Sequence, residues 1–195
     1  MKQLQTRKVL IMNISKKLSL SVFILMICAL TINTQAQKLV APKQTAANEY
    51  KASMDGWYVD INEAYAESAR TGKPILANFT GTDWCGWCIR LKKQVFLTPQ
   101  FKEWAKNNVV LLELDFPRRF QLPENIKQQN ASLQQAFGVR GYPTIWVFDV
   151  IADPQTKQNQ LRGLAKTGYV AGGPAAFIKD LENKLAATKA QLNKQ

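Results

Sequence analysis

The sequence contains no histidine, and this absence removes several kinds of active site. Ser–His and Cys–His catalysis both need an imidazole base, and histidine is the commonest metal ligand among side chains. Cysteine is also scarce, because only Cys28, Cys85 and Cys88 are present. Sulfur, rather than imidazole, is therefore the first candidate for any chemistry that the chain performs.

Acidic residues are few: there are 14, against 26 lysines and arginines. Five of the basic residues and none of the acidic ones fall in residues 1–36, so the rest of the chain has 21 basic and 14 acidic residues, a net charge of +7. These positive charges are scattered, as at Lys92–Lys93 and Arg118–Arg119, and are not interleaved with aromatic residues as a nucleic-acid surface would require. The charge pattern favours a solvated basic surface and no nucleic-acid partner.

The N-terminus has the three parts of a secretory signal peptide. A basic stretch (1–17) precedes an apolar run (18–32) that is shorter than the roughly 20 residues needed to span a bilayer. Thr34-Gln35-Ala36 then supplies a small-residue cleavage site. We expect cleavage after Ala36, giving a periplasmic or secreted protein. An uncleaved membrane anchor is the alternative, and a lipoprotein anchored through Cys28 is disfavoured because the preceding Ile27 is large.

The remaining sequence predicts a polar linker over 37–55 and one domain over 56–192. Within the domain, apolar periodicity and Gly, Pro and Asn breakers predict alternating helices and strands. The helices are expected at 61–71, 89–96, 99–106, 131–137 and 174–188, and the strands at 75–79, 109–116, 145–149 and 160–165. Residues 117–130 are expected to form a long loop. A strand–helix–strand unit implies a parallel pair, and two strands joined by a turn imply an antiparallel one. The fold class is therefore α/β, a mixed central sheet with helices on both faces.

The motif that carries chemistry is Trp84-Cys85-Gly86-Trp87-Cys88. It follows a strand and lies at the start of a helix, where unpaired N–H groups and the helix dipole stabilise a thiolate. Cys85 is predicted to be the exposed nucleophile and Cys88, one turn further on, the resolving thiol. Gly86 and Trp87 would tune the relative stability of the dithiol and disulfide states, and Trp84 would shield one side of the site. An inert structural disulfide and half of a zinc site are the alternatives, but no further Cys or His remains for a four-ligand zinc site.

Two stretches together, 79–88 (Phe-Thr-Gly-Thr-Asp-Trp-Cys-Gly-Trp-Cys) and 141–144 (Gly-Tyr-Pro-Thr), resemble the thioredoxin superfamily. They are most similar to its exported branch, related to the C-terminal domain of periplasmic disulfide reductases. The resemblance covers about Trp57 to Lys189 and implies a thioredoxin fold in which Pro143 is a cis proline. The Tyr142 backbone would then be free to pair with an extended substrate beside Cys85. An ordinary trans proline at the start of a strand is the alternative.

One position departs from the family pattern. Thioredoxins have a buried aspartate before the active site, whereas the nearest equivalent here is Asn78, which cannot accept a proton. Asp83 and Glu113 are candidates for that role, although each also fits a solvated or loop-fixing carboxylate. Asp115 is interpreted as structural.

The leading hypothesis is an enzyme, an exported thiol–disulfide oxidoreductase that needs no cofactor. Its partners would be proteins with disulfides or thiols and a membrane electron donor, and the Gly-Trp pair between the cysteines favours the reducing or isomerising direction. No second domain is visible of the kind that an isomerase usually uses. A peptide-binding module with a latent disulfide and a carrier of a soft metal such as Cu(I) are the alternatives.

Overall fold

The computed structural model describes residues 50–152, 155 and 159–194. The predicted signal peptide (1–36) and the first part of the predicted linker (37–49) lie outside the described residues. Of the linker, the described part packs on the domain: Met54 is buried in the core, and Ser53 hydrogen-bonds to Glu113. The division of the chain at residues 36 and 55 stays a prediction.

The elements alternate along the chain as the sequence predicted, except within residues 117–130. The helices are α2 (Ile61–Thr71), α3 (Gly86–Leu91), a π-helical turn η1 (Lys92–Phe96), α4 (Pro99–Asn108), α5 (Glu124–Ala136) and α6 (Gly173–Leu192). The strands are β1 (Ile75–Thr80), β2 (Val110–Asp115), β3 (Thr144–Ala152) and β4 (Asn159–Thr167). The active-site helix begins at Gly86, three residues before the predicted 89–96 segment, because Cys85 itself serves as its N-cap.

The four strands form one mixed sheet in the order β2-β1-β3-β4. β1 pairs with β2 in parallel and with β3 antiparallel, and β3 pairs with β4 antiparallel, which leaves β4 at an edge as predicted. Tyr58 adds a parallel bridge to Leu112 on the outer side of β2 that the sequence did not predict. This bridge ties the entry of the domain to the sheet.

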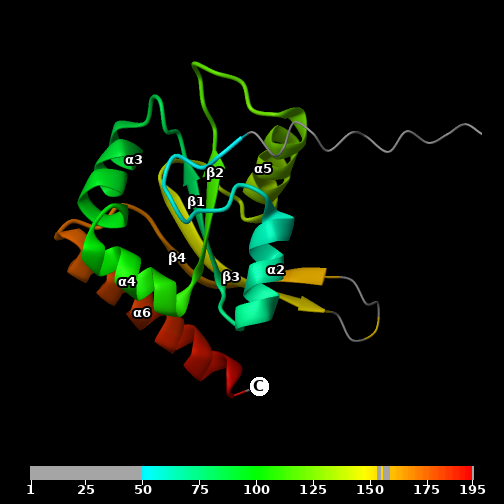
Figure 1. Cartoon of the computed structure of the whole chain (residues 1–195). Coiled ribbons are helices and arrows are strands. Elements are labelled where there is room, and N and C mark those ends of the chain that lie inside the picture. The colour runs from blue at the N-terminus through cyan, green and yellow to red at the C-terminus, as the bar shows by residue number, and fades with distance from the viewer. Residues whose placement is uncertain (1–49, 153–154, 156–158, 195) are drawn as a thin grey trace, which may run out of the picture. The chain divides into compact units, whose positions relative to one another are not determined.

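Helices cover both faces of the sheet, as Figure 1 shows, with α3, α4 and α6 on one side and α2 and α5 on the other. Every residue of β1 is buried, as expected for a central strand covered on both faces. Leu76 belongs to the core shared with α3, η1, α4 and α6, whereas Ala77 and Phe79 belong to the core shared with α2 and α5. This alternation confirms the predicted α/β class with helices on both faces.

The predicted loop over 117–130 is wrong in its second half, because α5 begins at Glu124 rather than at residue 131. The buried residues of α5 are Ile126, Asn130 and Leu133, which have helical spacing. The middle one is polar, so the apolar periodicity was hidden in the sequence. Asn130 is buried because its Nδ2 donates to the Asp115 carbonyl at the end of β2, 2.9 Å away.

The segments that follow β1 and β2 lie at the same end of the sheet, because the two strands are parallel (Figure 1). The first is the turn into α3, and the second is the 116–123 loop, which leads into α5. The fold therefore brings the cysteine motif and the 116–123 loop together. In the part of the chain that the structure describes, no helix is long and apolar enough to cross a membrane.

Candidate redox site

Cys85 and Cys88 are joined by a disulfide at the start of α3. Cys85 is the N-cap residue, and its Sγ accepts a hydrogen bond from the Cys88 backbone N–H at 3.2 Å. The first-turn N–H groups of a helix have no partner within the helix, and the dipole is positive there. A thiolate at Cys85 would therefore be stabilised by the backbone.

Cys85 is less exposed than the sequence predicted. The residue is 6% exposed, close to the 4% of Cys88. The physical reason is the N-cap geometry, which turns the Cys85 sulfur back over the first helical turn. Exposure therefore does not distinguish the nucleophile from the resolving thiol. The two cysteines differ instead in their positions on the helix.

Trp84 is held against the site by four separate contacts. Its Nε1 donates to the Phe116 carbonyl at 2.8 Å, and its ring meets Tyr142 edge-on with centroids 5.8 Å apart. The Arg118 guanidinium lies 3.7 Å from the centre of the indole. On the remaining side the indole contacts Gly81, where an added Cβ would come within 2.5 Å of Cε2 and Nε1. Trp84 is thus part of a fixed wall beside the disulfide.

Asp83 fixes the 116–123 loop. Its carboxylate accepts hydrogen bonds from the backbone N–H groups of Arg118 and Arg119, at 2.6 to 3.1 Å. Desolvation acts in the opposite direction, but these N–H groups hold the pKa of Asp83 below its ordinary value. The role of a loop-fixing carboxylate, one of the two predicted for Asp83, is the one that this geometry supports.

Gly86 and Trp87 lie between the cysteines and face outward. Trp87 is 54% exposed, and its ring contacts Tyr169 at 5.0 Å and the Arg90 guanidinium at 4.7 Å. A Cβ added at Gly86 would meet no atom within 4 Å. The space beside this pair is therefore open to a partner.

Tyr142 lies next to Trp84, and the peptide bond between Tyr142 and Pro143 is cis. The Tyr142 ring packs on Phe116 as well as on Trp84, and its hydroxyl accepts a hydrogen bond from Gln134 Nε2 at 2.6 Å. Burial raises the pKa of the Tyr142 hydroxyl above its ordinary value. Tyr142 therefore links α5, the 116–123 loop and the Trp84 wall.

Two buried carboxylates lie on β2, near the redox end of the sheet. Glu113 is directly opposite Asn78 in the β1–β2 register and accepts hydrogen bonds from Ser53 N and Oγ. Burial raises the pKa of Glu113, and the Ser53 hydrogen bonds offset this only in part. Asp115 accepts from Thr82 N and Oγ1, and burial raises its pKa too. Asn78 Oδ1 is buried without a hydrogen-bond partner among the described residues.

The residues that sequence reasoning missed come from the 116–123 loop and α5. Arg118, Phe116 and Gln134 contact Trp84 or Tyr142, although they lie 30 or more residues from Trp84 in sequence. Their contribution depends on the parallel β1–β2 pairing and on the start of α5. Within the described ranges, no group of three or more His, Cys, Asp or Glu residues could hold a metal ion.

Comparisons with known proteins agree with this geometry. A family model described as thioredoxin-like matches residues 56–150. The disulfide bond reductase DsbH of Chlamydia pneumoniae is 35% identical over 127 residues, which cover 63% of this chain and 71% of that protein. The thioredoxin-related protein DsbJ of the same organism is 30% identical over 105 residues, 54% of this chain and 30% of that protein. A solved structure of a DsbH oxidoreductase superposes with a TM-score of 0.58 at 32% identity, covering 67% of this chain and 83% of that one.

The chain belongs to the thioredoxin-like family. Its enzyme class is thiol–disulfide oxidoreductase, and both the predicted fold and the predicted family are confirmed.

Proposed function

We propose that this protein reduces disulfide bonds in exported proteins, with Cys85 as the nucleophile and Cys88 as the resolving thiol. The observation that carries the proposal is the hydrogen bond from the Cys88 N–H to Cys85 Sγ at the N-cap of α3. A thiolate there is favoured over one further along the helix, because the unpaired N–H groups are concentrated in the first turn. The similarity to a protein named disulfide bond reductase supports the reducing direction.

The reaction takes the dithiol form to the disulfide form seen in the structure. The Cys85 thiolate attacks one sulfur of a substrate disulfide, forming a mixed disulfide and releasing the other substrate sulfur as a thiolate, which takes up a proton. Cys88 then loses its proton and attacks Cys85 Sγ. The Cys85–Cys88 disulfide forms, the second substrate sulfur leaves as a thiol, and two electrons have passed to the substrate.

The substrate would bind across Trp84, Gly86, Trp87, Tyr142 and Pro143. Trp87 supplies an exposed apolar surface, and the open space at Gly86 lets a substrate backbone approach the sulfur atoms. Trp84 and Tyr142 are held by their neighbours, so they present a shape that is already formed before binding. A preformed surface lowers the entropic cost of binding.

The site of action would be the periplasm or the outside of the cell, reached through the signal peptide over 1–36. Each turnover leaves the enzyme oxidised, so a donor must restore the dithiol. Reducing equivalents outside the cytoplasm have to cross the membrane, which makes a membrane electron donor the partner that fits this direction. Cleavage after Ala36 would give an exported protein that begins at Gln37, as mass spectrometry of the secreted or periplasmic form would show. A form that retains residues 1–36 in the membrane fraction would favour the anchor instead.

The assignment of roles is tested by trapping. Cys88→Ser leaves the nucleophile without its resolving partner, so a mixed disulfide with a disulfide-containing protein should accumulate, visible as a mass adduct under non-reducing conditions. Cys85→Ser should form no such adduct, and both variants should lose turnover. Adducts that form equally through Cys88 in Cys85→Ser would contradict the assignment, and turnover retained in both variants would contradict the enzyme itself.

A further inference from the structure

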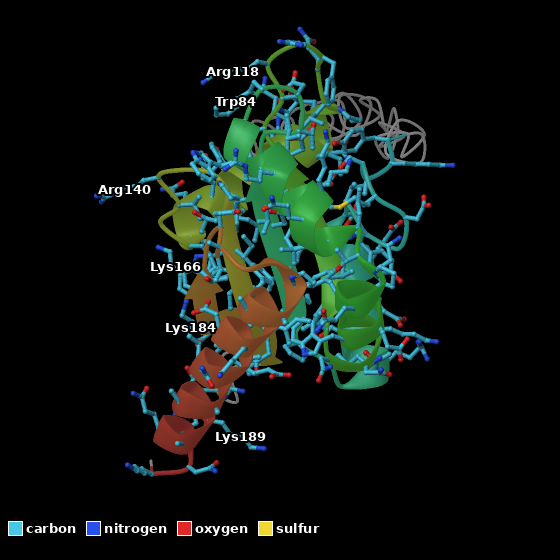
Figure 2. The ribbon with its side chains drawn as sticks, turned by 90° about the vertical axis from the view of Figure 1, so that its left-hand side faces the viewer. Trp84, Arg118, Arg140, Lys166, Lys184 and Lys189 are labelled. Carbon is cyan, nitrogen blue, oxygen red and sulfur yellow. A yellow bond between two sulfur atoms is a disulfide. The ribbon has the colours of Figure 1, made fainter. Side chains whose placement is uncertain are left out.

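Four exposed arginines lie on the segments that carry the residues of the redox site. Arg118 stacks on Trp84 and Arg90 on Trp87, Arg119 follows Arg118 in the 116–123 loop, and Arg140 lies two residues before Tyr142. Figure 2 shows Arg118 beside Trp84 at one end of the molecule and Arg140 projecting outward below them. We call these four residues the arginine rim.

The positive charge of the rim is not neutralised by side-chain ion pairs. The four ion pairs formed between side chains of the described residues involve none of the four arginines. Two acidic residues lie close to the rim: Asp83, whose carboxylate accepts backbone N–H groups of the 116–123 loop and interacts electrostatically with Arg119, and Glu124, which lines the same pocket as Arg118. Asp115 is 1% exposed and is bound by Thr82. The four guanidinium groups outnumber these carboxylates, so a molecule approaching the disulfide meets a net positive charge.

The surface beside the rim is concave and partly apolar. A pocket of about 370 Å³ lies between the 116–123 loop and the start of α5. Its lining includes Phe116 and Phe120, the cations of Arg118 and Lys127, and the carboxylate of Glu124. Phe120 and Trp87 are two of the four large apolar residues that the described chain exposes. Exposed aromatic residues next to arginines are typical of protein-binding surfaces.

We propose that the arginine rim selects polypeptides that carry carboxylates beside the reacting disulfide. The inference rests on the proposed function and names its substrate class. A guanidinium is planar, and its N–H donors point outward in that plane. When its face lies over an indole, the donors stay free to bind a carboxylate through two hydrogen bonds. Charge complementarity at such a rim raises the association rate and is weakened by salt.

The test uses two peptides with the same internal disulfide, one with two glutamates beside a cysteine and one with two glutamines. The reduced protein is mixed with each, and the second-order rate constant of its oxidation is followed by tryptophan fluorescence. Each rate is divided by that of the same peptide with 2-mercaptoethanol, an uncharged thiol, so that differences in leaving-group reactivity cancel. At low salt the glutamate peptide should react about tenfold faster, and the preference should approach one at about 1 M salt, where screening is nearly complete.

Variants assign the preference to the rim. Arg118→Gln combined with Arg140→Gln should lower the preference at least about threefold, because it removes two of the four guanidinium groups that can pair with the glutamates. Arg118→Lys keeps the charge and should retain more of the preference than Arg118→Gln. The matched control combines Lys189→Gln, near the C-terminal end of α6 and far from Trp84 (Figure 2), with Lys194→Gln, two residues after that helix ends. It removes the same charge and should leave the preference unchanged.

Equal normalised rates for the two peptides would overturn this inference, and so would a preference that the double rim variant leaves intact. In both cases disulfide exchange still occurs, so the proposed function would stand. Exchange with neither peptide would instead overturn the proposed function and this inference with it. The rim variants are also sedimented with vesicles of anionic phospholipid. Loss of vesicle binding with an unchanged peptide preference would make the rim a membrane-contact surface and would overturn the proposal.

Discussion

At the scale of single residues, Trp84 connects two segments of the site that are far apart in the sequence. It contacts the 116–123 loop through the Phe116 carbonyl and Arg118, and the cis-proline segment through Tyr142. The indole reaches this position because Gly81 has no Cβ. A residue next to the nucleophile is thus positioned by contacts from segments far apart in the sequence.

Gly81→Ala should displace Trp84. The added Cβ would lie 2.5 Å from the indole, and such overpacking costs about 1 to 3 kcal/mol when a neighbour must shift. We expect a lower free energy of unfolding in urea and a slower oxidation of the reduced protein by a disulfide peptide. Gly86→Ala is the control for folding, because its Cβ has open space beside the same cysteine. A Gly81→Ala protein as stable and as fast as the wild type would contradict the proposed packing.

Glu113→Gln should change how stability depends on pH. Burial raises the pKa of Glu113 above its ordinary value of 4.5, so the folded state binds this proton more tightly than the unfolded state. The resulting contribution to stability is complete below pH 4.5 and is lost as the pH rises through the raised pKa. The loss is about 1.4 kcal/mol for each pH unit that separates the folded and unfolded pKa values. Glutamine keeps an acceptor for the Ser53 N–H and removes the charge.

The free energy of unfolding of wild type and Glu113→Gln should therefore diverge as the pH rises, with the variant gaining relative to the wild type. Urea titrations at a series of pH values measure this difference. Glu103→Gln, which makes the same change at an exposed position, is the control. A Glu113→Gln difference that stays constant over the series would show that Glu113 is not perturbed by burial.

At the scale of elements, the position of the 116–123 loop depends on α5. Asn130 joins the two, because its buried Nδ2 donates to the carbonyl of Asp115, the last residue of β2. The loop that carries Arg118 begins directly after that carbonyl. A polar residue in the middle of a helix thus anchors the end of a strand.

Asn130→Ala should destabilise the protein by about 1 to 3 kcal/mol, because it leaves the buried Asp115 carbonyl without its donor. The same substitution at Asn125, which is exposed on the same helix, should change the free energy of unfolding by less than about 0.5 kcal/mol. Urea denaturation of the two variants measures the contrast. Equal effects would mean that the Asn130 hydrogen bond does not hold the loop.

The helices show where sequence reasoning succeeds and where it fails. α2 could be predicted closely, because Asp60 caps its first turn and Gly72 adopts the left-handed conformation that ends it. The start of α5 could not, because its stripe of buried residues includes Asn130 and its N-cap is Pro123, without a side-chain cap. The burial of Asn130 follows from a partner in β2, and such a tertiary partner is invisible in local periodicity.

The candidate site divides in the same way. The cysteines, Trp84 and Tyr142 could be found from the sequence, because their chemistry and their spacing are local. The contribution of Arg118 could not, since it depends on the loop after β2 lying over the turn after β1. The limited exposure of Cys85 was missed for a related reason: it is set by the backbone geometry of its N-cap position.

At the scale of the whole molecule, the fold extends beyond the region that the family model matches. That region ends at residue 150, but β4 completes the sheet, and α6 supplies Phe177, Ile178 and Leu181 to the core beneath α3. Phe177 contacts the rings of Phe96 and Phe101. The helix that carries the cysteines is therefore supported by the C-terminal part of the chain.

The equilibrium reduction potential of the Cys85–Cys88 pair tests the central claim most directly. The protein without residues 1–36 is equilibrated with a series of glutathione buffers, and tryptophan fluorescence is followed, because Trp84 and Trp87 flank the sulfur atoms. Potentials in this fold span roughly −270 to −120 mV. We expect a reversible two-electron transition nearer the reducing end, as a disulfide reductase requires. A value near the oxidising end would contradict the proposed direction, and cysteines that keep one redox state across the whole series would contradict thiol–disulfide exchange itself.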